Sequence, residues 1–121
     1  MKTEPLARTA LLLSALAGLF AVAAGALAAH GLEGRAAVWM EKASRYAMWH
    51  GLALAVAVAL ELASLPLVLA FAAGILLFSG SLAAMALGAP GALARITPLG
   101  GVAFLVGWVI LALEVLRARR R

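Results

Sequence analysis

Long apolar stretches without charged residues alternate with short polar segments along the chain. Residues 9–29 are uncharged and would extend for about 31 Å as a helix, which matches the hydrocarbon core of a bilayer. Three further apolar stretches cover about residues 46–64, 67–88 and 98–116. Leu65-Pro66 and a Gly-Ala-Pro-Gly-Ala turn sequence at residues 88–92 separate these stretches. The pattern predicts four membrane spans in a single transmembrane domain of residues 1–121.

The segment between the first two spans has its own pattern. At about residues 34–44 apolar and charged side chains fall on different faces at helical spacing. This spacing predicts a short amphipathic helix lying in the membrane interface, with Trp39 at the headgroups. The same residues also fit the first turns of the second span, emerging into water. The sequence leaves both interpretations open.

Small residues recur every three or four positions in the predicted spans, as is typical of helices that pack closely in lipid. The glycines expected at these packing seams are Gly18, Gly25, Gly80, Gly88, Gly100 and Gly107. They predict an all-α integral membrane protein folded as an antiparallel four-helix bundle, with a second copy of the chain as the alternative partner for one stripe. We expect Gly80 to face another helix, and Leu76 and Leu82 to face lipid.

Composition excludes a water-soluble domain. Hydrophobic residues make up 66% of the 121 positions and charged residues 12%, whereas soluble domains have about 45 to 50% and about 25%. The net charge of +5 does not indicate nucleic-acid binding, because four of the ten basic residues occupy the last five positions, directly after an apolar run. Such a tail favours an anionic lipid surface. The chain has no cysteine, which excludes disulfides and thiolate chemistry.

The distribution of basic residues predicts the orientation in the membrane. The side of the termini carries Lys2, Arg8, Arg117, Arg119, Arg120 and Arg121, and the opposite side carries Arg35, Lys42, Arg45 and Arg95. This bias predicts both termini in the cytoplasm. A cleaved signal peptide ending near Ala26-Leu27-Ala28 is the competing interpretation. The first apolar run is longer than the usual 7 to 15 residues of such peptides, so we expect it to be retained.

A few polar residues are the candidates for function, because polar groups are costly inside a bilayer. On the side of the first loop the sequence places His30, Tyr46, His50, Ser79, Ser81 and Thr97. One hypothesis is a polar pocket in which the histidines carry protons or bind a ligand. The other, which we favour, is that these groups only hydrogen-bond within the helices, with His50 bonded to Tyr46 or to a neighbouring carbonyl.

No cofactor, metal or catalytic motif is evident. Two histidines without a carboxylate make a poor zinc site, and a haem held by both histidines is a weak alternative because His30 should lie at the interface. Glu61 and Glu114 fall on the opposite side of the membrane. Since the chain has no P-loop, nucleophile elbow, zinc-protease helix or dinucleotide fingerprint, we expect that it is not an enzyme.

Several motifs resemble one family. Gly-Ala-Leu-Ala-Ala-His-Gly-Leu at 25–32, Leu-Phe-Ser-Gly-Ser-Leu at 77–82 and Ile-Thr-Pro-Leu-Gly-Gly at 96–101 resemble the domain-of-unknown-function 423 family. Its members are small four-span bacterial inner-membrane proteins, similar to the animal transmembrane protein 256. Leu27 and Ala28 depart from the phenylalanine and glycine usual in the first motif, and Ala83 from a common aromatic residue. The resemblance implies architecture and location but no activity.

Two functions are therefore expected. The first is a structural or interaction component of the bacterial inner membrane, without catalysis, because the first span has no carboxylate that could drive proton-coupled transport. Its partners would be membrane lipids, a second copy of the chain or another membrane protein, and not nucleic acid. The alternative is a protein that binds or transports a small solute, an ion or a lipid, with a polar pocket on the side of the first loop.

Overall fold

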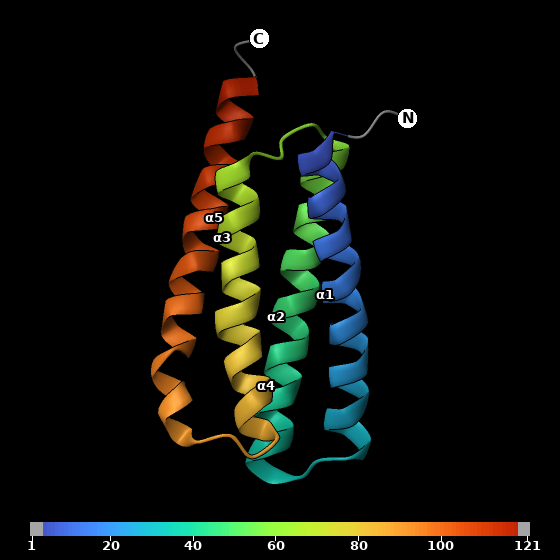
Figure 1. The fold of residues 1–121 in the computed structure, drawn as a ribbon, viewed down its shortest axis with the longest axis vertical. Helices are drawn as coiled ribbons and strands as arrows, with labels where there is room; N and C mark the ends of the chain where they lie inside the picture. The colour runs from blue at the N-terminus through green and yellow to red at the C-terminus, as the bar shows by residue number, and fades with distance from the viewer. Residues whose placement is uncertain (1–3, 119–121) are drawn as a thin grey trace.

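The computed structural model describes residues 4–118, and this part of the chain is entirely helical. Lys2 and Arg119 to Arg121, which enter the charge argument above, lie outside the described residues. The helices form four long rods joined by short loops (Figure 1). The elements are α1 (Pro5–His30), α2 (Gly34–Ala59), α3 (Leu65–Gly74), the π-helical η1 (Ile75–Ser79), α4 (Gly80–Ala86), the 3₁₀ helix η2 (Gly91–Arg95) and α5 (Thr97–Ala118). The α3, η1 and α4 elements make one continuous rod, here called the middle rod.

Three of the rods are long and apolar enough to cross a membrane: Pro5–His30, Leu65–Ala86 and Gly91–Ala118. The second rod, α2, is as long as α1 but differs in composition. Its first half carries Arg35, Glu41, Lys42 and Arg45, and its apolar residues are concentrated in the second half. The chain is thus an all-α protein with three candidate spans and one helix of mixed character.

The first half of α2 corrects one prediction. Residues 34–44 are not a separate interfacial helix, because α2 runs without a break from Gly34 to Ala59. After Gly34 no glycine or proline follows in this segment, so nothing ends the helix there. Part of its apolar face packs inside the protein. Met40 and Ala43 are buried in a cluster with residues of α1 and α4, and the segment is the first three turns of α2.

The rods are arranged in an open row. The main contacts join α1 to α2, α2 to the middle rod, and the middle rod to α5. As Figure 1 shows, α1 and α5 therefore lie at opposite edges of the row, and they make no substantial contact with each other. Many large apolar side chains on these two edge helices are exposed, as expected for surfaces that meet lipid.

Two clusters of buried side chains hold the row together, one toward each end of the rods. The cluster nearer the termini contains Ala10, Leu54, Ala57, Leu67, Val68, Phe71 and Phe104. The cluster nearer the first loop contains Ala24, Met40, Ala43, Leu82, Ala83, Met85 and Ala86. Leu82 is only 6% exposed, so the prediction that it faces lipid is wrong, whereas Leu76 is 71% exposed.

Glycines and phenylalanines interlock where the middle rod meets α5. The ring of Phe104 lies directly over Gly74, and the ring of Phe71 lies directly over Gly107, so each helix supplies one ring and one gap. A β-carbon at either glycine would overlap the ring above it. Gly100 of α5 approaches the backbone of the π-helical turn at Phe78 equally closely. These contacts set the distance between the two rods.

The other glycines expected at packing seams behave differently. A β-carbon at Gly25 would meet the Ser44 hydroxyl of α2 at 3.2 Å. Gly88 has φ +107° at the end of α4, a backbone conformation that favours glycine. Gly18 and Gly80 have open space or only ordinary contacts around them, so neither marks a close approach within this chain, contrary to the prediction. For Gly18 the reason is that α1 turns its Ala17 face toward α2, with Gly51 opposite, and the atoms nearest to Gly80 belong to its own rod.

Candidate functional site

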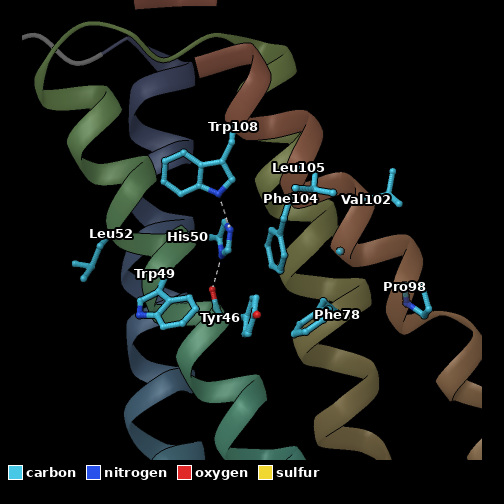
Figure 2. Close-up of a pocket in the computed structure, with 11 residues that line it drawn as sticks. Tyr46, Trp49, His50, Leu52, Phe78, Pro98, Val102, Phe104, Leu105 and Trp108 are labelled. Atoms are coloured by element: carbon cyan, nitrogen blue, oxygen red, sulfur yellow. Dashed lines mark hydrogen bonds between the residues drawn. The ribbon is translucent and has the colours of Figure 1, made fainter. Parts of the chain in front are cut away.

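A buried histidine occupies the gap between α2 and α5. His50 is 4% exposed. Its Nδ1 lies 2.7 Å from the backbone oxygen of Tyr46, and the indole nitrogen of Trp108 on α5 lies 3.0 Å from its Nε2 (Figure 2). Because an indole nitrogen can only donate, Nε2 accepts this bond, and Nδ1 carries the hydrogen donated to the carbonyl. Both ring nitrogens of His50 are therefore paired.

Aromatic rings enclose the same histidine. Phe104 stacks on the imidazole with 3.5 Å between ring centroids and 11° between planes. Phe71 meets it edge-on at 5.1 Å, and Tyr46 lies 6.1 Å away on the same helix. Since Phe104 and Phe71 are the two rings that interlock with glycines, the seam between the middle rod and α5 also fixes the position of the imidazole.

A cavity of about 810 Å³ lies beside this cluster, between α2 and α5, and the middle rod forms its floor. We call it the lateral groove. Trp49, Leu52 and Leu105 on its rim are all more than half exposed, so the groove opens sideways. Its walls are almost entirely apolar (Figure 2). The lining residues are Tyr46, Trp49, His50, Leu52, Phe78, Pro98, Gly101, Val102, Phe104, Leu105 and Trp108.

The six residues of the predicted polar pocket do not lie together in the structure. Tyr46 and His50 line the lateral groove, but the other four do not. The Ser79 hydroxyl donates to the Ala43 carbonyl of α2 at 2.8 Å. The hydroxyls of Ser81 and Thr97 share a hydrogen bond of 2.5 Å that joins α4 to α5.

His30 is exposed at the end of α1 and takes no part in the groove. The sequence argument failed here because it started the second span near residue 46. The helix begins at Gly34, so His50 lies about 24 Å along α2 from its start at the first loop. His30 and His50 therefore belong to different depths, and a haem held by both histidines is excluded. Among residues 4–118 no three His, Asp or Glu side chains come close enough to hold a metal ion.

Sequence reasoning missed several members of the site. Trp108, Phe104 and Phe71 surround His50, and Ser44 on α2 donates to the Ala21 carbonyl of α1 at 2.6 Å. The spacing of Phe104 and Trp108, four residues apart on one helix face with Gly107 beside them, was the available signal. It shows that these rings share a face, but not which helix that face meets.

The fold and this site define an integral membrane protein, in which apolar helices carry a few polar side chains that hydrogen-bond to one another or to backbone carbonyls. The chain belongs to the family described as Protein of unknown function (DUF423), which matches residues 24–101. The resemblance in the sequence motifs is thus confirmed.

Curated relatives agree with this assignment. A UPF0382 membrane protein of Haemophilus influenzae is 46% identical over 111 residues, covering 84% of this chain and 89% of that protein. UPF0382 membrane protein SERP0230 of Staphylococcus epidermidis is 40% identical, covering 88% and 94%. UPF0382 membrane protein YwdK of Bacillus subtilis is 39% identical, covering 88% and 95%. No solved structure matches the chain significantly. The names give a membrane location and no activity.

Proposed function

We propose that the chain crosses the bacterial cell membrane four times, as an antiparallel bundle. The support for α2 as the fourth span is its position. It packs along α1 on one side and along the middle rod on the other, and both of these have the length and apolarity of spans. A helix enclosed in this way lies at the same depth as its neighbours. The charged first turns of α2 then reach the interface beside the first loop.

In this arrangement the two termini share one side of the membrane, which we assign to the cytoplasm. Figure 1 draws the described ends of α1 and α5 at the same end of the molecule. Arg8, near the start of α1, and Arg117, in the last turn of α5, lie there. The positive-inside tendency favours that end as cytoplasmic.

Within the membrane the protein acts as a structural or interaction component, without catalysis and without a bound cofactor. The observation that carries this proposal is the use of its polar side chains. Ser44, Ser79, the Ser81 and Thr97 pair, and the His50 and Trp108 pair each join two different rods. Buried polar groups that join neighbouring helices in this way fix the positions of the helices, which is the role expected of a structural component. Its partners are membrane lipids and a second copy of the chain or another membrane protein.

Transport by the purified protein is the decisive test of this function. The full chain is reconstituted in liposomes, and proton flux and uptake of a cationic dye are measured against protein-free liposomes. We expect no difference between the two samples. Flux that is abolished by His50→Ala would instead establish a transport protein and overturn the structural role.

Labelling of single cysteines tests the topology, because the chain has no cysteine of its own. Glu33→Cys in the first loop and Ala92→Cys in the third are exposed, as is Arg117→Cys near the end of α5. A membrane-impermeant maleimide should label the first two on intact cells, and the third only after permeabilisation. Labelling of Glu33→Cys and Ala92→Cys from opposite sides would disprove four spans.

A further inference from the structure

We propose that the lateral groove binds one anionic phospholipid, with an acyl chain between α2 and α5 and the phosphate at Arg95. This inference goes beyond the proposed structural role and names a lipid site that the role does not require. It stands on three observations: the shape of the groove, the chemistry of its walls and the charge at one of its ends.

The shape of the groove fits a single hydrocarbon chain. The α5 residues that line it run from Pro98 to Trp108, about 15 Å along the helix axis. The groove opens sideways, toward the surface that meets lipid, and has a volume of about 810 Å³. An acyl chain is much thinner than a helix, so it can lie inside the groove along this length.

The walls of the groove select an apolar occupant. Four polar side-chain groups belong to its lining. The imidazole of His50 and the indole nitrogen of Trp108 bond to each other and to the Tyr46 carbonyl, whereas the Tyr46 hydroxyl and the Trp49 indole nitrogen can still donate. All other lining residues are aliphatic or aromatic, so most of the wall area suits methylene groups.

The charge at the end of the groove selects an anionic headgroup. Pro98 marks the end of the groove nearest the loop side (Figure 2), and the exposed Arg95 precedes it by three residues at the end of η2. Among residues 4–118, Arg95 makes no ion pair, while Arg45 on the α2 side is paired with Glu41 at 3.5 Å. A guanidinium binds a phosphate through two parallel hydrogen bonds. Arg95 is therefore a cation available to a lipid whose chain lies in the groove. Lys42 on α2, exposed, without an ion pair among the described residues and one helical turn before the first groove-lining residue of that helix, is a second one.

Quenching of tryptophan fluorescence by brominated lipids tests the proposal directly, because Trp49 and Trp108 line the groove. The full chain, with Trp39→Phe to remove the remaining tryptophan, is reconstituted in phosphatidylcholine nanodiscs. These contain increasing fractions of chain-brominated phosphatidylglycerol or chain-brominated phosphatidylcholine. One basic residue at an anionic surface corresponds to about a fivefold change in affinity. We expect half-maximal quenching at an about fivefold lower fraction of phosphatidylglycerol.

Two pairs of variants identify the groove and the headgroup contact. Arg95→Gln should abolish the preference for phosphatidylglycerol, and Arg117→Gln at the other end of α5 should preserve it. Gly101→Leu should weaken quenching by both lipids, because its side chain enters the groove with only Phe78 at 4.0 Å, and Gly18→Leu on open α1 surface should not. Melting temperatures equal to that of the parent show that these exposed or open positions leave the fold intact.

Three results would overturn the lipid site. Equal half-quenching fractions for the two lipids would show that the tryptophans contact only the ordinary surrounding lipid and that the groove has no specific site. A preference that survives Arg95→Gln would place the headgroup elsewhere. Quenching that disappears as the ratio of protein to lipid rises would show that a second copy of the chain covers the groove. The transport assay is independent of all three, so failure of the lipid site leaves the proposed structural role standing.

Discussion

At the scale of single residues, His50 shows how a membrane helix tolerates an imidazole. A polar group in hydrocarbon is costly unless it is paired. Both ring nitrogens of His50 are paired, one to its own helix and one to Trp108 of α5. Because the two partners belong to different helices, the imidazole acts as a polar link between α2 and α5, which otherwise contact each other little.

Replacing the indole should show the value of this link. Trp108→Phe keeps a ring in place but removes the donor to Nε2 of His50, so we expect a loss of about 1 kcal/mol in the free energy of unfolding. Trp49→Phe is the matched control, since Trp49 lines the same groove and is half exposed. Unfolding in a detergent titration measures both. Equal losses in the two variants would mean that the hydrogen bond contributes nothing.

Glu61 offers a residue-scale gain in stability. It has φ 58°, in the left-handed region, at the turn that ends α2, where the Leu62 amide bonds back to the Ala57 carbonyl. Glycine adopts this conformation without steric cost, so Glu61→Gly should stabilise the protein by about 1 kcal/mol. Glu61→Ala removes the same charge but keeps a β-carbon, and should bring no gain. A melting temperature raised equally by both would assign the effect to charge.

At the scale of elements, close packing of the middle rod against α5 depends on a glycine in each rod, over which a phenylalanine ring of the other rod lies. Gly74→Ala and Gly107→Ala each place a methyl group against a phenylalanine ring, Phe104 or Phe71. Overpacking of this kind should cost about 1 to 3 kcal/mol. Gly18→Ala has open space and should be close to neutral. Thermal melting in one detergent compares the three variants, and a parent-like Gly74→Ala would show that the rods separate without strain.

The elements were more predictable from sequence than their faces. Uncharged runs of membrane length and the Leu65-Pro66 break locate helices whatever surrounds them, so α1 and the middle rod agree with expectation. Which side of a helix meets a neighbour depends on residues far away in the chain. Leu82 is buried only because Met40 and Ala43 of α2 lie near it. For the same reason the sequence left open whether residues 34–44 lie in the interface or form the first turns of the second span. The structure has the second arrangement, in which α1 and α4 cover Met40 and Ala43.

The candidate site was also predictable in its local features but not in its contacts between helices. Sequence identified the scarce polar residues and, in one of its two interpretations, a bond from His50 to Tyr46 or to a neighbouring carbonyl. The structure has the bond to the Tyr46 carbonyl, which is local to one helix turn. Sequence did not identify Trp108, which lies 58 residues from His50 in the chain. The periodicity of a sequence shows on which face of its helix a residue lies. Which neighbouring helix that face contacts depends on how the rods pack.

At the scale of the whole molecule, the open row predicts that its two outer seams are energetically independent. Ser44→Ala removes the bond between α2 and α1, and Thr97→Val removes the bond between α5 and α4. These seams share no partner and lie on opposite sides of the row, so the losses of the single variants should add to within about 0.5 kcal/mol in the double variant. A double-mutant cycle from detergent unfolding measures this. A larger coupling would indicate that α1 and α5 close into a ring.

The row has a further consequence for the order in which the protein is made. Each rod after the first packs on the one that precedes it in the chain: α2 on α1, the middle rod on α2, and α5 on the middle rod. As the helices enter the membrane one after another during synthesis, each new helix therefore finds a packing partner already present. No rod has to wait for a partner synthesised much later. The order of the helices across the row is therefore also the order in which they can assemble.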